Sequence, residues 1–206
     1  MPVIDHPLLK RDLTVLRDKR TPHGTFRRVL ADASAVLAYE AMRRLDVDTF
    51  SIETPLEETE GYALKDEVVV VPILRAGLGL VDGFTRFVPE ARIGHLGMYR
   101  DEETLQPVDY YSNIPAVLDR AHVFLVDPML ATGGSAIGAL THLKKLGAKR
   151  LTFVCLVAAP EGIDKLESAH PDVPIFAAAL DRQLNDIGYI LPGLGDAGDR
   201  IFGTDV

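Results

Sequence analysis

The chain has 206 residues, of which 47% are hydrophobic and 25% are charged, a composition typical of a globular protein that buries a full core. Its formal net charge of −8 argues against a nucleic-acid-binding protein that works through a broad basic face. The first residues lack the apolar core of a signal peptide, and no apolar run is long enough to span a bilayer. We therefore expect a single cytoplasmic domain (residues 1–206) with no nucleic-acid or membrane partner, in which an anionic substrate needs a local positive site.

The first 66 residues are expected to form an arm, a helix and a hairpin outside the main sheet. Residues 1–24 contain proline breaks and many basic side chains, which favours an irregular, solvated segment with one short helix. Apolar residues at helical spacing predict a helix from residue 25 to residue 45. Short strands at 50–54 and 62–64, joined by a turn, are typical of a β-hairpin.

Strands and helices alternate from residue 67 to residue 180. The β-branched run Val68–Val71 is typical of a strand buried on both faces, as in the centre of a parallel sheet. Alternation of this kind implies right-handed βαβ units and an open parallel sheet, in which ligands bind at the carboxyl ends of the strands. The expected strands are 67–74, 91–98, 122–126, 150–157 and 174–180. The expected helices end near Val88, span 136–146 and span 160–169, and residues 181–206 form a glycine-rich tail.

Neither the cysteine nor the histidines indicate a reactive or metal-binding centre. Cys155 lies in the apolar run 151–157, where a thiolate is disfavoured, so we expect it in the core. It is the only cysteine, which excludes disulfides within the chain. The six histidines are scattered, with no partner at metal-ligand spacing.

The stretch from Asp127 to Ser135, called the 127–135 loop below, is the main candidate for a binding site. It joins a strand to a helix, so free N–H groups and the positive end of the helix dipole point at one spot. Thr132 and Ser135 add hydroxyl donors, and Gly133 and Gly134 allow a phosphate to approach the backbone. The alternative is an ordinary strand-to-helix turn.

Two further loops should meet the 127–135 loop at the same edge of the sheet. Arg75 follows one buried strand, and Arg100 begins a polar stretch (100–115) that we expect to be a long, irregular lid or binding loop. Two guanidinium groups and an anion site suit a ligand with phosphates at both ends. Asp127 fits such a site if it accepts hydrogen bonds from sugar hydroxyls or lies near a metal. The alternatives are a structural salt bridge for Arg75 and a solvated loop charge for Arg100.

These residues lie in strings that resemble a known family. VDPMLATGGS (126–135) is similar to the substrate loop of type I phosphoribosyltransferases. The resemblance to uracil phosphoribosyltransferases covers nearly the whole chain from about residue 25. It rests on VVPILRAGLG (70–79), GMYRDEETL (97–105), LVAAPEGI (156–163) and GYILPGLGDAGDRIFGT (188–204). It implies an α/β fold with an open, mainly parallel sheet flanked by helices. An N-terminal arm, helix and small hairpin (1–66), a core sheet (67–180) and a C-terminal base-binding hood (181–206) would complete the domain.

The resemblance also implies a reaction, in which uracil and 5-phospho-α-D-ribose 1-diphosphate (PRPP) give UMP and diphosphate with Mg²⁺, in pyrimidine salvage. Asp127, Arg100 and Asp196 would be catalytic. PRPP would contact Arg75, Arg100, Asp127, Pro128, Met129, Leu130, Ala131, Thr132, Gly133, Gly134, Ser135 and Asp196. Uracil would contact Ile190, Gly195, Asp196 and Ala197, largely through backbone groups.

Pro128 departs from the wider superfamily, in which many members carry a second acid at that position. The resemblance therefore implies that PRPP and water hold most of the magnesium, with no direct protein ligand. It also implies a homo-oligomer and, in some members, activation by GTP. Three alternatives remain at this stage: an RNA-binding pyrimidine regulator of the same fold, a phosphoribosyltransferase for another base, and a catalytically silent homologue.

Overall fold

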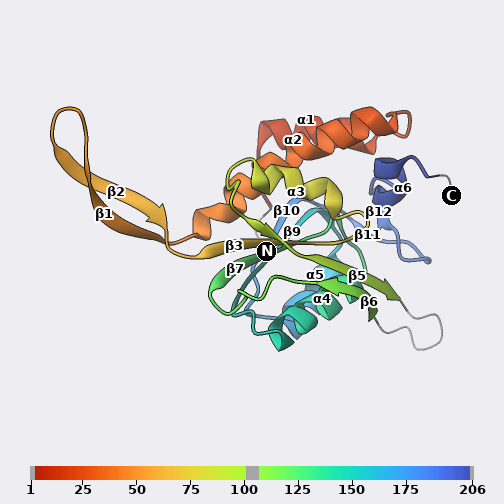
Figure 1. Ribbon diagram of the computed structural model, residues 1–206. Helices are drawn as coiled ribbons and strands as arrows, with labels where there is room; N and C mark the ends of the chain where they lie inside the picture. Colours follow the sequence, from red (N-terminus) through yellow and green to blue (C-terminus); the bar gives the residue numbers. More distant parts are fainter. Residues whose placement is uncertain (1–2, 101–106, 205–206) are drawn as a thin grey trace.

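The structure is a computed structural model that describes residues 3–100 and 107–204, apart from the side chains at 99–100 and 107–110 (Figure 1). Its main sheet has the strand order β10-β9-β7-β3-β5-β6, and all neighbours along it are parallel except β5 and β6. The predicted open, mainly parallel sheet is therefore confirmed. Its strands are β3 (Glu67–Leu74), β5 (His95–Arg100), β6 (Pro107–Asn113), β7 (Ala121–Val126), β9 (Arg150–Ala158) and β10 (Ile175–Leu180). Two short strands, β4 (Arg92–Ile93) and β8 (Met129–Leu130), pair with β3 and β9.

Helices cover both faces of this sheet, because successive side chains of each buried strand point to opposite sides. Val68 and Val70 of β3 pack in one core cluster, whereas Val69 and Val71 pack in the other. The first cluster lies under α1 (Pro7–Arg17), α2 (His23–Ala41), α3 (Leu78–Thr85) and α6 (Ala197–Phe202). The second lies under α4 (Gly134–Lys145) and α5 (Pro160–Ala169), on the other side of the sheet in Figure 1. Cys155 is fully buried in the second cluster, as expected.

The N-terminal segment contains the one short helix that was expected, but the prediction that the segment is solvated was wrong. Helix α1 buries Leu9, Leu13 and Leu16, which are at most 7% exposed, against α2. These leucines recur at helical spacing, but the basic residues between them obscured the apolar face. Helix α2 begins two residues earlier than predicted, after Pro22, and ends in a 3₁₀ turn, Met42–Arg44.

The predicted hairpin is confirmed. Strands β1 (Val47–Glu53) and β2 (Glu58–Leu64) form a separate two-stranded antiparallel sheet that projects away from the body of the molecule (Figure 1). Every residue of the two strands is exposed except Gly61, which Phe50 and Ile52 cover from the opposite strand. The side chains of the hairpin are therefore not packed in the hydrophobic core of the chain.

The stretch from residue 91 to residue 115 differs from the prediction in two places. The predicted strand 91–98 is split at Gly94 into β4 and β5. The predicted loop 100–115 contains β6, which pairs with β5 as an antiparallel edge strand, and an edge position tolerates the proline at its start. Residues 101–106 of that loop lie outside the described residues. The side chain of Arg100 does too, although its backbone ends β5.

The glycine-rich tail also folds into short elements. Strands β11 (Gln183–Leu184) and β12 (Ile190–Leu191) form a small antiparallel pair, and α6 follows. The side chain of Asp196 caps α6 by accepting the Asp199 N–H at 2.9 Å, and Gly203, with φ of +67°, ends the helix. Among the described residues, no helix is long and apolar enough to cross a membrane.

Candidate active site

The loops that follow β3 and β7 meet at the carboxyl edge of the sheet, as predicted. The two strands are adjacent and parallel, with Pro72 opposite Val126. Arg75 and Asp127 therefore follow the ends of neighbouring strands. Gly77 allows the loop after β3 to lie close to the end of β7, because a β-carbon added there would lie 2.5 Å from the Val126 carbonyl oxygen. The Leu74–Arg75 peptide bond within the first loop is cis.

The backbone of the 127–135 loop is supported by contacts with β9 and α5. The Pro128 carbonyl accepts hydrogen bonds from two β9 amides at 3.0 Å, and the Leu130 carbonyl accepts the Ala159 N–H at 2.9 Å. Gly162 of α5 packs directly under the loop, since a β-carbon there would lie 2.3 Å from the Ala131 carbonyl oxygen. Pro128, Met129 and Leu130 therefore position the loop through main-chain bonds.

The end of this loop has the features of an anion site. Gly133 adopts φ of +81° and precedes the first turn of α4, whose N–H groups lack partners within the helix. No acidic residue lies in that first turn to repel an anion. Thr132 and Ser135 are half-buried, which leaves both accessible to a ligand. The segment from Ala131 to Ser135 can therefore bind a phosphate group by main-chain and hydroxyl donors.

Asp127 carries the most strongly perturbed carboxyl group at this edge. Part of the residue is reachable by solvent, yet burial of the carboxyl raises its pKa to about 7, against a single opposing hydrogen bond from the Met129 N–H at 3.4 Å. The negative charge of Asp196, from the tail, raises this pKa slightly further. The fold thus joins the tail to the strand ends, 69 positions apart in sequence. A hydroxyl donor or a cation next to Asp127 would favour the charged form of its carboxyl group.

Arg75 makes an ion pair within the protein. Its Nη2 atom donates to Oδ1 of Asp199 at 3.1 Å, and its guanidinium lies 5.9 Å from the centre of the Phe202 ring. The Thr204 hydroxyl and this arginine together hold the pKa of Asp199 below its usual range. The arginine side chain is 56% exposed, and exposed pairs contribute about 0–1 kcal/mol, so a phosphate can compete for it. Without a ligand, Arg75 thus forms the salt bridge that was the alternative interpretation of this residue.

The tail covers the loop from the other side. Gly188, with φ of +86°, packs against the Thr132 methyl group, from which an added β-carbon would be 3.5 Å away. Glu161 of α5 accepts the Leu184 N–H at 3.0 Å and so ties the β11–β12 pair to the same helix that supports the loop. Ile190 is 4% exposed and its side chain packs in the core.

Three contributors were not anticipated from the sequence. Gly162 supports the 127–135 loop, Asp199 pairs with Arg75, and Glu161 anchors the tail. The proline at the start of α5 marks a helix N-terminus, where a following glycine is a usable signal of close approach. For Asp199 and Glu161, no pattern in the neighbouring sequence indicated these contacts. Within the described ranges, no three His, Cys, Asp or Glu residues lie close enough together to hold a metal ion.

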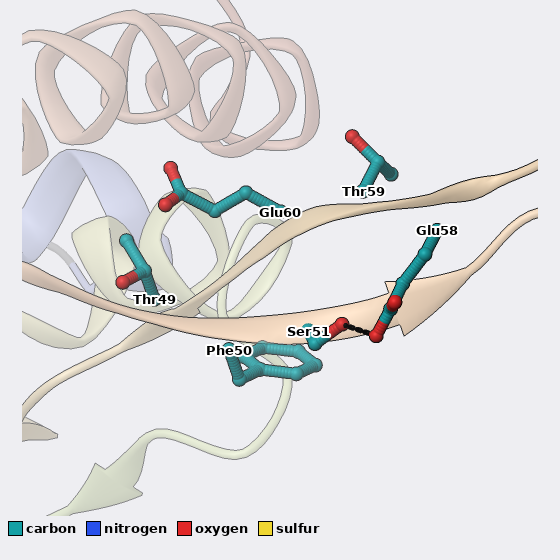
Figure 2. A pocket seen from close by; sticks show the side chains of 6 residues that line it. All are labelled: Thr49, Phe50, Ser51, Glu58, Thr59 and Glu60. Carbon is teal, nitrogen blue, oxygen red and sulfur yellow. Dashed lines mark hydrogen bonds between the residues drawn. The ribbon is translucent and has the colours of Figure 1, made fainter.

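A hollow of about 350 Å³ lies on the β1–β2 hairpin (Figure 2). Its lining contains two carboxylates and no cationic side chain, and Figure 2 shows Ser51 hydrogen-bonded to one of them, Glu58. Such a surface repels phosphate, so the hairpin is a poor candidate for the phosphate site. The lining residues are Thr49, Phe50, Ser51, Glu58, Thr59 and Glu60.

Comparison with known proteins agrees with this geometry. The family model described as uracil phosphoribosyltransferase matches residues 3–204. A uracil phosphoribosyltransferase of Salinibacter ruber is 67% identical over 98% of this chain and 96% of its own length, and one of Fervidobacterium nodosum is 54% identical over 98% of each. The solved structure of the AQ2163 protein from Aquifex aeolicus has a TM-score of 0.93 and 38% identity, covering 100% of this chain and 99% of that one.

More distant structures share the fold alone. A purine phosphoribosyltransferase from Pyrococcus horikoshii has a TM-score of 0.52 at 17% identity, covering 74% of this chain and 83% of its own. The shared part corresponds to a type I phosphoribosyltransferase fold. With a sheet, loops and strand-end chemistry of this kind, and a family match over nearly its whole length, the chain belongs to the uracil phosphoribosyltransferase family.

Proposed function

We propose that this chain transfers the phosphoribosyl group of PRPP to uracil, giving UMP and diphosphate, with the strand-end site as its active centre. The observation that carries the proposal is Asp127, whose buried carboxyl group begins the loop that leads into the N-terminus of α4. An anion site next to a carboxylate matches a sugar phosphate, which presents an anionic group and hydroxyl donors at neighbouring positions.

Each part of PRPP has a chemically matched group in this arrangement. The 5-phosphate would bind the N–H groups from Ala131 to Ser135, and the ribose hydroxyls would donate to Asp127. Departure of diphosphate builds positive charge on the ribose, which the carboxylates of Asp127 and Asp196 stabilise. Positioning of the two reactants contributes much of the remaining acceleration, and no protein nucleophile is needed.

The diphosphate end of PRPP would be bound by arginine side chains. Arg75 would leave Asp199 for the diphosphate, and Arg100, from the end of β5, would approach the same group. Mg²⁺ bound together with PRPP would neutralise charge on the leaving diphosphate. We expect PRPP and water to supply most of its ligands, because Pro128 occupies the position where a second consecutive acid would stand.

Selection of uracil would depend on main-chain groups of the tail. Ile190 and the stretch Gly195 to Ala197 would offer backbone donors and acceptors to the base. An N–H aimed at the O4 carbonyl of uracil would face an amino group if cytosine entered instead. A mismatched buried donor of this kind can discriminate by about 10⁴-fold.

The test is a competition between bases. The protein is incubated with PRPP, Mg²⁺ and equal concentrations of uracil, cytosine and hypoxanthine, and the nucleotides formed are separated and quantified. We expect UMP to be the dominant product. Formation of another nucleotide would indicate a phosphoribosyltransferase for that base, and no nucleotide at all would favour a silent or regulatory homologue.

The proposal includes assembly of the chain with copies of itself through the β1–β2 hairpin. Two-stranded hairpins are marginally stable in water, yet this one exposes Phe50, Ile52 and Leu56 at 50%, 39% and 94%. A second copy offers the apolar cover that the chain itself lacks. GTP activation stays a prediction of the family resemblance.

The double variant Phe50→Ser/Ile52→Ser is expected to weaken self-association by at least about tenfold, because interface energy is concentrated in a few large apolar side chains. Sedimentation velocity over a concentration series measures this. Leu146→Ser, an equally exposed leucine just after α4, is the matched control and should associate like the wild type. A wild type that stays monomeric at all concentrations would exclude this part of the proposal.

A further inference from the structure

The N-terminal helix α1 is joined to the tail by an ion pair that is not part of the ligand site. The guanidinium of Arg17 makes a two-pronged contact with the Asp181 carboxylate, with Nη1–Oδ2 and Nη2–Oδ1 distances of 2.7 and 2.6 Å. The two side chains are 25% and 6% exposed, so the pair is largely removed from water. Its partners lie 164 positions apart in sequence.

This ion pair also holds both polar groups of one residue of the tail. The Gly193 N–H donates to Oδ2 of Asp181 at 2.8 Å, and the Gly193 carbonyl accepts from Nη1 of Arg17 at 2.8 Å. Gly193 adopts φ of +57°, and a β-carbon there would lie 2.2 Å from the Ile190 carbonyl oxygen. The main chain is therefore fixed at a point between Ile190 and Gly195.

A second arginine holds the next residue of the tail against the same helix. Nη1 of Arg200 donates to the carbonyl groups of Leu16 and Leu194, the latter at 2.7 Å, and Nη2 donates to the Asp18 carbonyl at 2.7 Å. Its guanidinium stacks 4.5 Å from the centre of the Phe26 ring. The end of α1 thus contacts the tail at two consecutive residues.

The location of these contacts suggests a purpose beyond stability. A buried ion pair is weak evidence for added stability, because desolvation offsets most of the attraction between the charges. When a pocket recognises its ligand through backbone donors and acceptors, however, its selectivity depends on how well the main chain is held in place. Glycine-rich main chain is intrinsically free to move, so it needs external contacts to keep one conformation.

We infer that Arg17 and Asp181 are positioning residues for the uracil pocket, which act by fixing the Gly193 peptide and hence the backbone of residues 195–197. This inference rests on the function proposed above. It gives the N-terminal helix a role in base binding, although no residue of α1 touches the proposed ligand site.

The test compares Arg17→Lys and Asp181→Asn with the wild type. Lysine keeps the charge but loses the planar fork, and asparagine keeps one acceptor for the Gly193 N–H but loses the ion pair. We expect the KM for uracil to rise about tenfold or more in each variant, because small misplacements of binding groups are costly. The KM for PRPP should stay within about twofold of the wild type. The preference for uracil over cytosine should fall in parallel.

Two controls separate positioning from general destabilisation. Arg11→Lys makes the same substitution on the same helix, where Arg11 pairs with its neighbour Asp12 and does not contact the tail, and should change neither KM. The double variant Arg17→Lys/Asp181→Asn should raise the KM for uracil no more than either single variant, since the two residues act as one unit. Thermal unfolding of every variant is recorded alongside.

Equal rises in both KM values, or values unchanged from the wild type, would overturn the inference. If one single variant does not fold, the other decides the question by the same criterion. If neither folds, the pair is required for the fold itself and the inference is overturned as well. Wild-type protein that forms no UMP would instead refute the proposed function, so the two failures are distinguishable.

Discussion

Asp127→Asn is expected to lower turnover by at least about 100-fold, the size of effect seen when a preorganised electrostatic group is removed from an active site. The substitution removes the negative charge next to the ribose on which positive charge develops, and it replaces an acceptor for two hydroxyls by an amide. Initial rates of UMP formation at saturating uracil and PRPP measure the loss. Asp164→Asn, on the exposed side of α5, is the matched control and should retain wild-type rates. Near-normal turnover in Asp127→Asn would refute the ribose role.

The same variant is expected to be more stable than the wild type above neutral pH. The folded protein holds the Asp127 proton up to a pKa of about 7, whereas the unfolded chain releases it near 3.8. Between these values the folded state binds more protons, so the wild type loses stability as pH rises from about 4 to about 7. An asparagine has no such proton to lose.

The gain in the free energy of unfolding should be about 1–3 kcal/mol at pH 8 and should vanish near pH 4. Urea unfolding at the two pH values measures it without substrate. A variant that is less stable than the wild type at pH 8 would show that burial does not strain this carboxylate. Loss of activity together with a gain in stability would show that Asp127 destabilises the folded protein and is needed for the reaction.

Gly162→Ala is expected to damage the 127–135 loop without changing any group that touches the ligand. The new β-carbon would lie 2.3 Å from the Ala131 carbonyl oxygen and 2.8 Å from that of Leu130, and both are backbone atoms that cannot turn aside. The loop has to shift, so the KM for PRPP should rise about tenfold or more. The free energy of unfolding should fall by about 1–3 kcal/mol.

Gly24→Ala is the control for this substitution. Gly24 lies in the first turn of α2, and nothing lies within 4 Å of a β-carbon added there. Its replacement should leave the KM for PRPP unchanged and stability equal or slightly higher. Wild-type PRPP kinetics in Gly162→Ala would mean that α5 does not position the loop.

Local pattern predicted much of this molecule. The run Val68–Val71 identified a central strand, and the strand, glycine turn and helix around the 127–135 loop were predicted because they are contiguous in sequence. Helix α1 and strand β6 were misread, because charged or turn-forming residues masked leucine spacing in one and edge pairing in the other. Tertiary packing alone decides such cases.

Contacts between distant residues were beyond prediction from pattern. The Arg75–Asp199 pair joins residues 124 positions apart, and neither residue type indicates its partner. The expectation that Asp127 and Asp196 both serve the ribose came only from the family resemblance. The structure adds the physical consequence, a carboxyl group whose pKa is raised to about 7 by burial and by its neighbour.

A crystal structure of the protein with UMP bound would test the central claim most directly, because UMP contains the base, the ribose and the 5-phosphate. We predict the phosphate on the N–H groups of residues 131–135, the ribose hydroxyls on Asp127, and the uracil against the backbone of Ile190 and residues 195–197. A nucleotide bound with its phosphate elsewhere, or with its ribose away from Asp127, would contradict the account.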